Sequence, residues 1–403
     1  MPAVTELELP AFDYGDPALR GDAFHAAMRD LRERTWLASM PLGFIAVERE
    51  AGEFFLRSRS FTFPGMKIAE IFGIDDGPLW EEMRRNILHI NGDHHRRLRG
   101  LVNPAFTPRA AERWRPAMRA TLEELFAPLA EEAEVVGALC KPYPSRVIAT
   151  VMGAPLADAG RLWDWSNTIQ RQFGLTVAEE RPQIEQAVVE FYEWANALLA
   201  RRRDDPGDDL ISTLIAARFE GERLDDDELL NLVLNVLVGG VDTTQSQLAH
   251  ALRLFAAHPD QWALLAERPE LAPQAVDEAI RFEPITPFTA RIALEEVVYR
   301  DVTFPEGTVV LVCAHTGNRD PAAYAEPDRF DIAAGRGSAK PLTFGAGPHY
   351  CLGANLARAE LQEALTFLAP RMPGLALAGE PEYGSVDGIY GLDALPVRWA
   401  QST

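Results

Sequence analysis

The sequence predicts a mainly α-helical protein with a small β portion, and two observations carry that prediction. Amphipathic patterns with the helical period run over residues 109–133 and 183–203, and a longer apolar pattern covers residues 229–258. Alternation typical of strands is limited to four short segments separated by Pro and Gly turns, at residues 44–48, 295–299, 308–313 and 397–399.

The composition indicates one globular domain over residues 1–403. Hydrophobic residues make up 47% of the chain and charged residues 25%, which is ordinary for a protein that buries a large core. Candidate site residues recur from His95 to Gly353, and the sequence between them contains no Ser/Gly-rich linker, low-complexity tract or repeat.

The long helix predicted over residues 229–258 follows an acidic run at 225–228, which supplies capping oxygens and negative charge to a helix N-terminus. Its first half is apolar nearly all round, which is typical of a helix buried through the protein centre. Gly239 and Gly240 lie in the middle of this helix, where each costs about 0.5 to 1 kcal/mol relative to alanine. We therefore expect a favourable interaction or a functional requirement to offset the cost of these two glycines.

Asp242, Thr243 and Thr244 follow the two glycines in an otherwise apolar stretch. Burying such side chains requires partners or water. One interpretation is a helix kink in which threonine hydroxyls bond back to the preceding turn; the other is a polar functional site.

Cys351 ends a glycine-punctuated turn at residues 344–353, which reads Phe-Gly-Ala-Gly-Pro-His-Tyr-Cys-Leu-Gly and precedes a helical run. The free amides of a helix start favour a thiolate there, as a nucleophile, a zinc ligand or a haem ligand. Cys140 and Cys313 stand alone without metal-ligand spacing, which disfavours zinc. His349 is a possible base for a nucleophile, but Phe344 and the glycines suit a flat apolar partner better.

The pattern Phe-Gly-x-Gly-x-His-x-Cys-x-Gly-x-x-x-Ala over residues 344–357 resembles the haem-binding loop of the cytochrome P-450 superfamily. This resemblance implies the cytochrome P-450 fold, with a long distal helix over a haem b cofactor (iron protoporphyrin IX). It also implies that Cys351 is the proximal iron ligand and that Phe344, Gly345 and Gly353 belong to the haem-binding loop.

The same resemblance extends to other motifs. Gly-Gly-x-Asp-Thr at 239–243 is similar to the distal helix, which implies that Gly240 makes room for haem and that Asp242 and Thr243 relay protons to dioxygen. Haem propionates need cationic or donor partners, and the resemblance implies four: His95, Arg99, Arg291 and His349. We prefer His95 over His94 because only His95 has an arginine four residues later.

Glu278 and Arg281 lie three residues apart on a predicted helix, so their side chains can pair. Alone, such a pair is an ordinary surface feature worth well under about 1 kcal/mol. The resemblance implies instead a buried structural pair joined by Arg329 of the Pro-x-Arg-Phe segment at 327–330.

Charge and length exclude several classes of protein. A net charge of −21 disfavours nucleic-acid binding. The longest apolar segment, residues 229–241, is too short to span a bilayer, and residues 1–10 lack a basic signal-peptide start. Three cysteines outside any disulfide framework fit a reducing compartment. We expect no membrane association, a cytoplasmic location and a bacterial source.

An arginine-rich stretch stands out against the acidic background, either as a solvated helical face or as a dock for an acidic protein. Between residues 94 and 119, one acid, Glu112, accompanies seven arginines: Arg96, Arg97, Arg99, Arg109, Arg113, Arg115 and Arg119.

The resemblance implies a monooxygenase that inserts one atom of O2 into a hydrophobic small molecule, with electrons from a ferredoxin and its ferredoxin reductase. The alternatives are a peroxide-using or isomerising haem-thiolate enzyme and a non-catalytic haem-binding protein. Apolar residues fall in the regions that line the family's pocket, although each is as readily core: Phe63, Met66, Ile71, Phe72, Val236, Ile285, Phe288, Ile389 and Tyr390.

Overall fold

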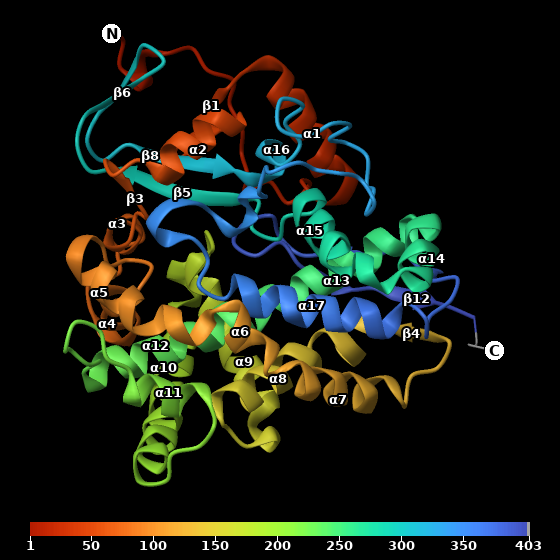
Figure 1. The fold of residues 1–403 in the computed structure, drawn as a ribbon. Helices are drawn as coiled ribbons and strands as arrows, with labels where there is room; N and C mark the ends of the chain where they lie inside the picture. Colours follow the sequence, from red (N-terminus) through yellow and green to blue (C-terminus); the bar gives the residue numbers. More distant parts are fainter. Residues whose placement is uncertain (401–403) are drawn as a thin grey trace. The chain divides into compact units, whose positions relative to one another are not determined.

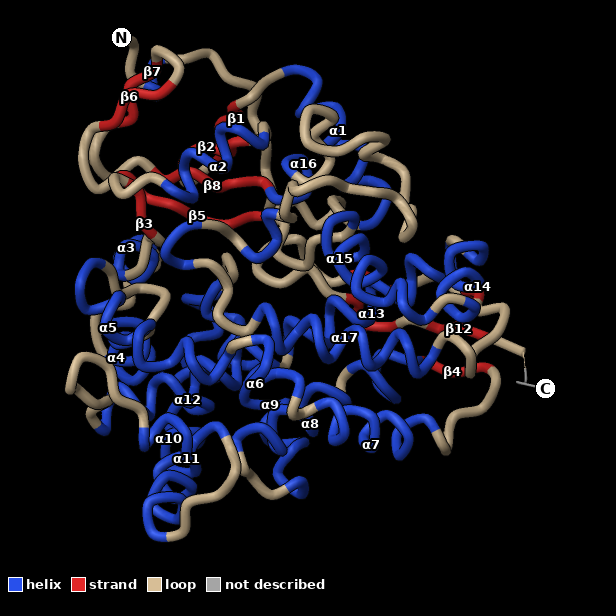
Figure 2. Tube along the Cα trace, in the orientation of Figure 1, coloured by secondary structure: helices blue, strands red, loops and turns tan. Residues whose placement is uncertain are grey.

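The structure is a computed structural model that describes residues 1–400. Helices make up 56% of it, which confirms the predicted mainly α fold (Figures 1 and 2). The chain forms two compact units, each built from segments that are far apart in sequence. The sheet unit comprises Met1–Pro64, Asp277–Cys351 and Tyr383–Gly391, and the helical unit comprises Gly65–Val276, Leu352–Glu382 and the chain from Leu392. The prediction of one domain stays a prediction.

The sheet unit contains a five-stranded sheet in the order β1-β2-β8-β5-β3, and only the β2–β8 pair is parallel. Its strands are β1 (Leu37–Met40), β2 (Gly43–Ala46), β8 (Val309–Cys313), β5 (Phe288–Ala293) and β3 (Phe61–Thr62). A separate hairpin joins β6 (Val297–Tyr299) to β7 (Val302–Phe304). The alternation at 44–48, 295–299 and 308–313 therefore marked real strands.

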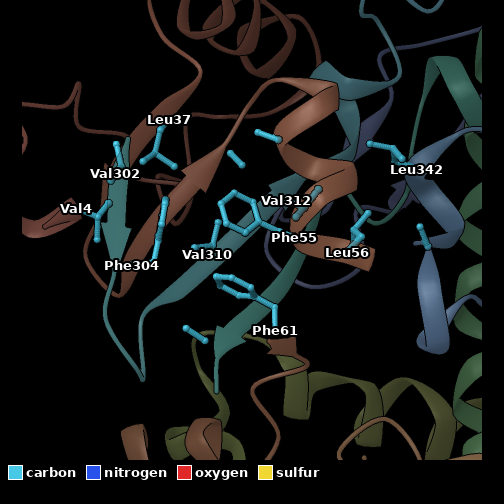
Figure 3. Packing of buried hydrophobic residues seen from close by; sticks show 14 of the residues in the cluster. Val4, Leu37, Phe55, Leu56, Phe61, Val302, Phe304, Val310, Val312 and Leu342 are labelled. Atoms are coloured by element: carbon cyan, nitrogen blue, oxygen red, sulfur yellow. The ribbon is translucent and has the colours of Figure 1, made fainter. Parts of the chain in front are cut away.

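Helix α2 (Arg49–Arg57) covers part of this sheet, and Figure 3 shows the apolar side chains between them. The Phe55 ring lies 5.0 Å from the Phe61 ring and 5.3 Å from the Phe304 ring, both in edge-on geometry. Burying each such aromatic contributes roughly 1.5 to 3 kcal/mol. Two more helices in this unit are α1 (Gly21–Arg34) and α16 (Ala314–Gly317), and α15 (Ala272–Phe282) begins in the helical unit.

The helical unit holds most of the helices. They are α3 (Met66–Ile71), α4 (Gly77–Arg85), α5 (Gly92–Val102), α6 (Pro108–Glu112), α7 (Arg115–Phe126), α8 (Pro142–Met152), α9 (Ala159–Gln170), α10 (Val177–Asp204), α11 (Leu210–Ala216), α12 (Asp226–Gly240), α13 (Asp242–Ala257), α14 (Pro259–Glu267) and α17 (Ala354–Leu368). A three-stranded sheet is ordered β4 (Glu132–Glu134), β12 (Pro396–Arg398), β9 (Ala376–Leu377). The remaining strands are β10 (Glu382–Tyr383) and β11 (Leu392–Ala394).

The predicted continuous helix over 229–258 is wrong in one respect, because it is two helices that meet at Val241. Helix α12 starts at Asp226, where the Asp225 carboxylate accepts from the Glu228 amide (2.8 Å) and the Glu228 carboxylate accepts from the Asp225 amide (3.0 Å). Val241 lies between the two helices with φ −92° and ψ −68°, still in the right-handed region, and its amide bonds to the Leu237 carbonyl (3.1 Å), so the break is slight. The acidic run therefore caps the helix as expected, while the glycines end it.

No helix in the part of the chain that the structure describes is both long and apolar enough to cross a membrane.

Candidate functional site

The cysteine loop is closed by a backbone hydrogen bond from the Cys351 amide to the Phe344 carbonyl (2.9 Å). Gly345 has φ +69° and ψ −165°, a region that is essentially restricted to glycine. At Gly347 the φ is +74°, and a Cβ would lie 2.7 Å from the carbonyl oxygen of Leu56. Both glycines are therefore required by the path of the backbone that presents Cys351.

Cys351 is the exposed cysteine among the three, since Cys140 and Cys313 are buried. Burial raises the pKa of both buried thiols, so they remain protonated and inert. The Phe344 and Tyr350 rings lie near the same turn, 6.2 Å apart. Helix α17 starts three residues after Cys351 with Gly353 as its N-cap, as expected. This loop can present a reachable sulfur.

Arg291 offers a buried cation in the same unit, on strand β5. Its side chain is 3% exposed, and burial lowers the pKa of the guanidinium to about 10. Among the described residues it pairs with no carboxylate, and its side-chain hydrogen bond goes to the carbonyl of Ala290 (2.8 Å). A buried cation is costly without a counter-charge, so this donor set fits an anionic group such as a haem propionate.

Helix α5 carries the predicted His95 and Arg99 in the helical unit. His95 is buried, whereas His94 is exposed and pairs with Glu228 (3.1 Å); the choice of His95 stays a prediction. Burial, with added repulsion from Arg99 and His94, lowers the pKa of His95 to about 4. The imidazole is therefore neutral at pH 7 and donates through one ring N–H.

Asp242 is a buried acid at the start of α13. Burial raises the pKa of its carboxyl to about 6, and a hydrogen bond from Asn167 and the charge of Lys141 limit that rise. The Thr243 hydroxyl donates to the Gly239 carbonyl (2.6 Å). The first interpretation of this motif, a threonine bonded back to the preceding turn, is confirmed, and the functional role of Asp242 and Thr243 stays a prediction.

The two glycines of α12 have different surroundings. A Cβ on Gly240 would lie 2.7 Å from the terminal methyl carbon of Ile148 on α8. A Cβ on Gly239 would meet nothing within 4 Å, and Gly239 is exposed. Gly239 is thus the glycine beside open space, whereas Gly240 allows close packing of α8; the predicted haem contact of Gly240 stays a prediction.

A family model described as Cytochrome P450 matches residues 176–267 and 261–368. Luteothin monooxygenase of Streptomyces thioluteus is 38% identical over 400 residues, which cover 97% of this chain and 96% of that protein. Mycinamicin IV hydroxylase/epoxidase of Micromonospora griseorubida is 39% identical over 307 residues, covering 75% and 76%. The crystal structure of CalO2 matches with a TM-score of 0.90 at 31% identity, covering 98% and 100%.

This chain belongs to the cytochrome P450 family. It is therefore an oxidoreductase of the monooxygenase type with haem as its cofactor. Both of the relatives named above are bacterial proteins. Each unit of this cytochrome P450 carries some of the predicted site residues, whose roles stay predictions. The sheet unit carries Arg291, Phe344, Gly345, His349 and Cys351, and the helical unit carries His95, Arg99, Gly240, Asp242, Thr243 and Gly353.

The predicted ion pair between Glu278 and Arg281 is present, but the prediction that Arg329 joins it is wrong. Glu278 accepts two hydrogen bonds from Arg281 (2.7 and 2.8 Å) in the buried interior of the sheet unit of this cytochrome P450. The second arginine on Glu278 is Arg336, at 3.1 and 2.5 Å. The side chain of Arg329 is exposed and pairs with Glu326 and Asp331, while its carbonyl accepts from Arg281 (3.1 Å).

The arginine-rich stretch is largely paired within the helical unit of the cytochrome P450. Arg115 and Arg119 on α7 bond to Glu363 on α17 (3.1 and 2.8 Å), and Arg97 on α5 pairs with Glu228. These arginines join helices, so the free cationic face is smaller than the sequence indicated. Arg109 is exposed, and no ion pair to it is found among the described residues.

Two of the predicted pocket residues pack against the core of the sheet unit. Tyr390 is fully buried, its ring lies 5.8 Å from the Phe24 ring, and its hydroxyl accepts from the Gly21 amide (2.8 Å). Phe288 packs edge-on against Phe24, at 6.1 Å between ring centroids. Both side chains make these contacts within the sheet unit, which favours the alternative that they are packing residues.

His25, Glu283 and His315 offer ligand atoms within 4.8 Å of one another in the sheet unit, which suggests a metal site. Arg319 Nη1, however, lies 3.2 Å from His315 Nδ1, and a guanidinium can only donate. His315 Nδ1 must therefore accept, which places the proton of the neutral ring on Nε2 and leaves no lone pair there for a metal. We interpret the cluster as a buried hydrogen-bonded network.

Proposed function

We propose that this cytochrome P450 inserts one oxygen atom from O2 into a hydrophobic small molecule, as a hydroxylation or a related oxidation. The observation that carries the proposal is Cys351, an exposed cysteine held by a loop whose glycines cannot be replaced. We propose Cys351 as the iron ligand, with Phe344, Gly345, Gly353 and Gly240 around the haem. The bound haem supplies the activation of dioxygen.

We propose that four side chains hold the haem propionates: His95, Arg99, Arg291 and His349. The buried, carboxylate-free guanidinium of Arg291 supports this role most directly. A neutral His95 supports it too, because its N–H can donate to an anion without a change of protonation.

Asp242 and Thr243 are proposed to deliver protons during catalysis. A carboxyl with a pKa of about 6 releases and regains a proton readily near neutral pH. The Thr243 hydroxyl has one proton, which it now donates to the Gly239 carbonyl (2.6 Å). If the hydroxyl turned away from that carbonyl, it could donate this proton toward dioxygen while its oxygen accepts another. This acid–alcohol pair distinguishes the proposal from a peroxide-using or isomerising enzyme, which would not need it.

The electrons are proposed to come from a ferredoxin and its reductase. The exposed Arg109, which has no ion pair among the described residues, supports an acidic partner, whereas the exposed Arg113 already pairs with Asp208 (3.0 Å). The relatives named as a monooxygenase and as a hydroxylase/epoxidase support oxidation of small molecules by this chain as well. A cytoplasmic location stays a prediction.

The test is the absorption spectrum of the dithionite-reduced protein under carbon monoxide. We expect a strongly red-shifted Soret band that is absent in Cys351→Ala and retained in the matched control Cys140→Ala, because only Cys351 is exposed. A histidine-type spectrum, or an unchanged band in Cys351→Ala, would contradict the assignment. Turnover with peroxide but not with reduced ferredoxin would favour the peroxide-using alternative, and haem binding without any turnover would favour a non-catalytic protein.

A further inference from the structure

From Asn231 to Thr244, helix α12 and the start of α13 are buried except along one stripe. Five residues at helical spacing keep accessible surface, while their neighbours Leu234, Leu237, Val238 and Asp242 are buried. The members of this accessible stripe are Asn235, Val236, Gly239, Gly240 and Thr243. Three of them, Gly239, Gly240 and Thr243, belong to the Gly-Gly-x-Asp-Thr motif, and Asn235 is the polar member farther along the same face.

The orientation of the Asn235 amide is fixed by its partner. Its Nδ2 lies 2.8 Å from both the carbonyl oxygen and the side-chain oxygen of Asn231. A backbone carbonyl can only accept, so the NH2 group of Asn235 must face Asn231. Its side-chain oxygen, Oδ1, therefore points away from Asn231.

Asn231 is itself held by two other helices and cannot turn to follow a ligand. It is 2% exposed, and its Nδ2 donates to the Tyr192 hydroxyl on α10 (3.1 Å) and to the Glu82 carbonyl on α4 (3.4 Å). Burial raises the pKa of Tyr192, so that hydroxyl keeps its proton. The position of Asn235 is thus set by a buried network that spans α4, α10 and α12.

Oδ1 of Asn235 accepts no hydrogen bond from any described residue, and Asn235 is only half-buried. We propose that Asn235 is a specificity-determining residue whose Oδ1 accepts a hydrogen bond from a hydroxyl or N–H group of the substrate. This inference rests on the proposed function. It places the donor group of the substrate eight helical residues, or about 12 Å, from Thr243.

The proposal narrows the substrate class to hydrophobic molecules with a hydrogen-bond donor remote from the oxidised carbon. A ligand without that donor would leave the acceptor unpaired in a partly desolvated site, which lowers affinity by roughly 10-fold to 100-fold. An all-hydrocarbon substrate would gain nothing from a fixed amide at this position.

The test uses imidazoles that ligate haem iron, because they report binding without a known substrate. Two series of increasing chain length, 1-(ω-hydroxyalkyl)imidazoles and 1-alkylimidazoles with methyl in place of the hydroxyl, are titrated by the shift of the Soret band. In the wild type, we expect the hydroxyl compound to bind about 10-fold tighter than its methyl counterpart at one preferred chain length. That preference should vanish in Asn235→Leu and Asn235→Ala but persist in the control Leu230→Ala, because Leu230 lies on α12 outside the accessible stripe.

Equal binding of both series at every length, or a preference that survives in both Asn235 variants, would overturn the role of Asn235 and leave the proposed function standing. If neither series shifts the Soret band and no thiolate spectrum forms under carbon monoxide, the proposed function fails instead, and this inference fails with it.

Discussion

Burial acts on single charged side chains of this cytochrome P450 in two directions. Removing a carboxyl from water favours its neutral form, which raises the pKa of Asp242 to about 6. Removing a guanidinium from water lowers the pKa of Arg291 to about 10, and the group remains charged at pH 7. The same physical effect therefore yields an acid that can exchange protons and a cation that can only bind an anion.

At the residue scale, we predict that Asp242→Asn stabilises the protein increasingly as pH rises. The wild-type carboxyl has a folded pKa above its unfolded value of 3.8, so its favourable contribution is complete below pH 3.8 and is lost as pH rises through about 6. Between these limits the free energy of unfolding of the wild type should fall relative to Asp242→Asn, by roughly 3 kcal/mol in total. Urea unfolding of both proteins from pH 4 to pH 8 measures this difference.

Asp164→Asn is a suitable control, because Asp164 lies on the solvent side of α9 and is exposed. A pH-independent stability difference between wild type and Asp242→Asn would show that folding does not raise the pKa of Asp242 and would remove the basis for its role in proton delivery.

At the element scale, the break between α12 and α13 follows from local chemistry that the sequence only partly reveals. The Gly239-Gly240 pair and the following threonines were visible, and both a kink and a functional motif were foreseeable from them. The exact break at Val241 was not, because it depends on the Thr243 hydroxyl bonding to the Gly239 carbonyl and on Ile148 of α8 packing against Gly240. The sequence around Val241 does not show that a residue of another helix, Ile148, packs against Gly240.

The two glycines should respond oppositely to alanine. Gly239→Ala places its methyl group in open space, so we expect a gain of about 0.5 to 1 kcal/mol in the free energy of unfolding. Gly240→Ala forces its methyl group against the buried Ile148, and we expect a net loss of roughly 1 to 2 kcal/mol. Thermal or urea unfolding of the two variants gives both values.

The double variant Gly240→Ala with Ile148→Ala provides the control, because alanine lacks both Cδ1 and Cγ1, the two atoms that a Cβ on Gly240 would meet. Most of the loss caused by Gly240→Ala should be recovered relative to Ile148→Ala alone. A Gly240→Ala protein as stable as Gly239→Ala would show that the packing of α8 adjusts freely.

Local motifs could be predicted across the whole molecule, whereas their long-range partners could not. The Cys351 loop, the choice of His95 and the Glu278–Arg281 pair all follow from short spacings in the sequence. Arg336, which occupies the position expected for Arg329, follows no such spacing, because it reaches Glu278 across 58 residues of chain. The arginines of α7 likewise bond to Glu363, which lies more than 240 residues later in the chain, so the sequence did not show that they were paired.

In a molecule with a net charge of −21, we distinguish arginines that join helices, such as Arg119, from exposed arginines that can meet a partner, such as Arg109. Arg119→Glu would place a like charge beside Glu363 and break the contact between α7 and α17, so we expect a loss of roughly 1 to 3 kcal/mol in stability. Arg109→Glu should leave stability within about 0.5 kcal/mol, since Arg109 is exposed. It should instead slow turnover driven by reduced ferredoxin, because attraction to an acidic partner falls.

The decisive measurement for Arg109 is the salt dependence of ferredoxin-driven turnover. Added salt screens exposed charges, so the difference between wild type and Arg109→Glu should be largest at low ionic strength and shrink as salt rises. Arg29→Glu on α1 changes the net charge by the same amount and serves as the matched control, because Arg29 is also exposed. If both variants slow turnover equally, the effect belongs to the net charge of the molecule, and Arg109 is not part of a ferredoxin dock.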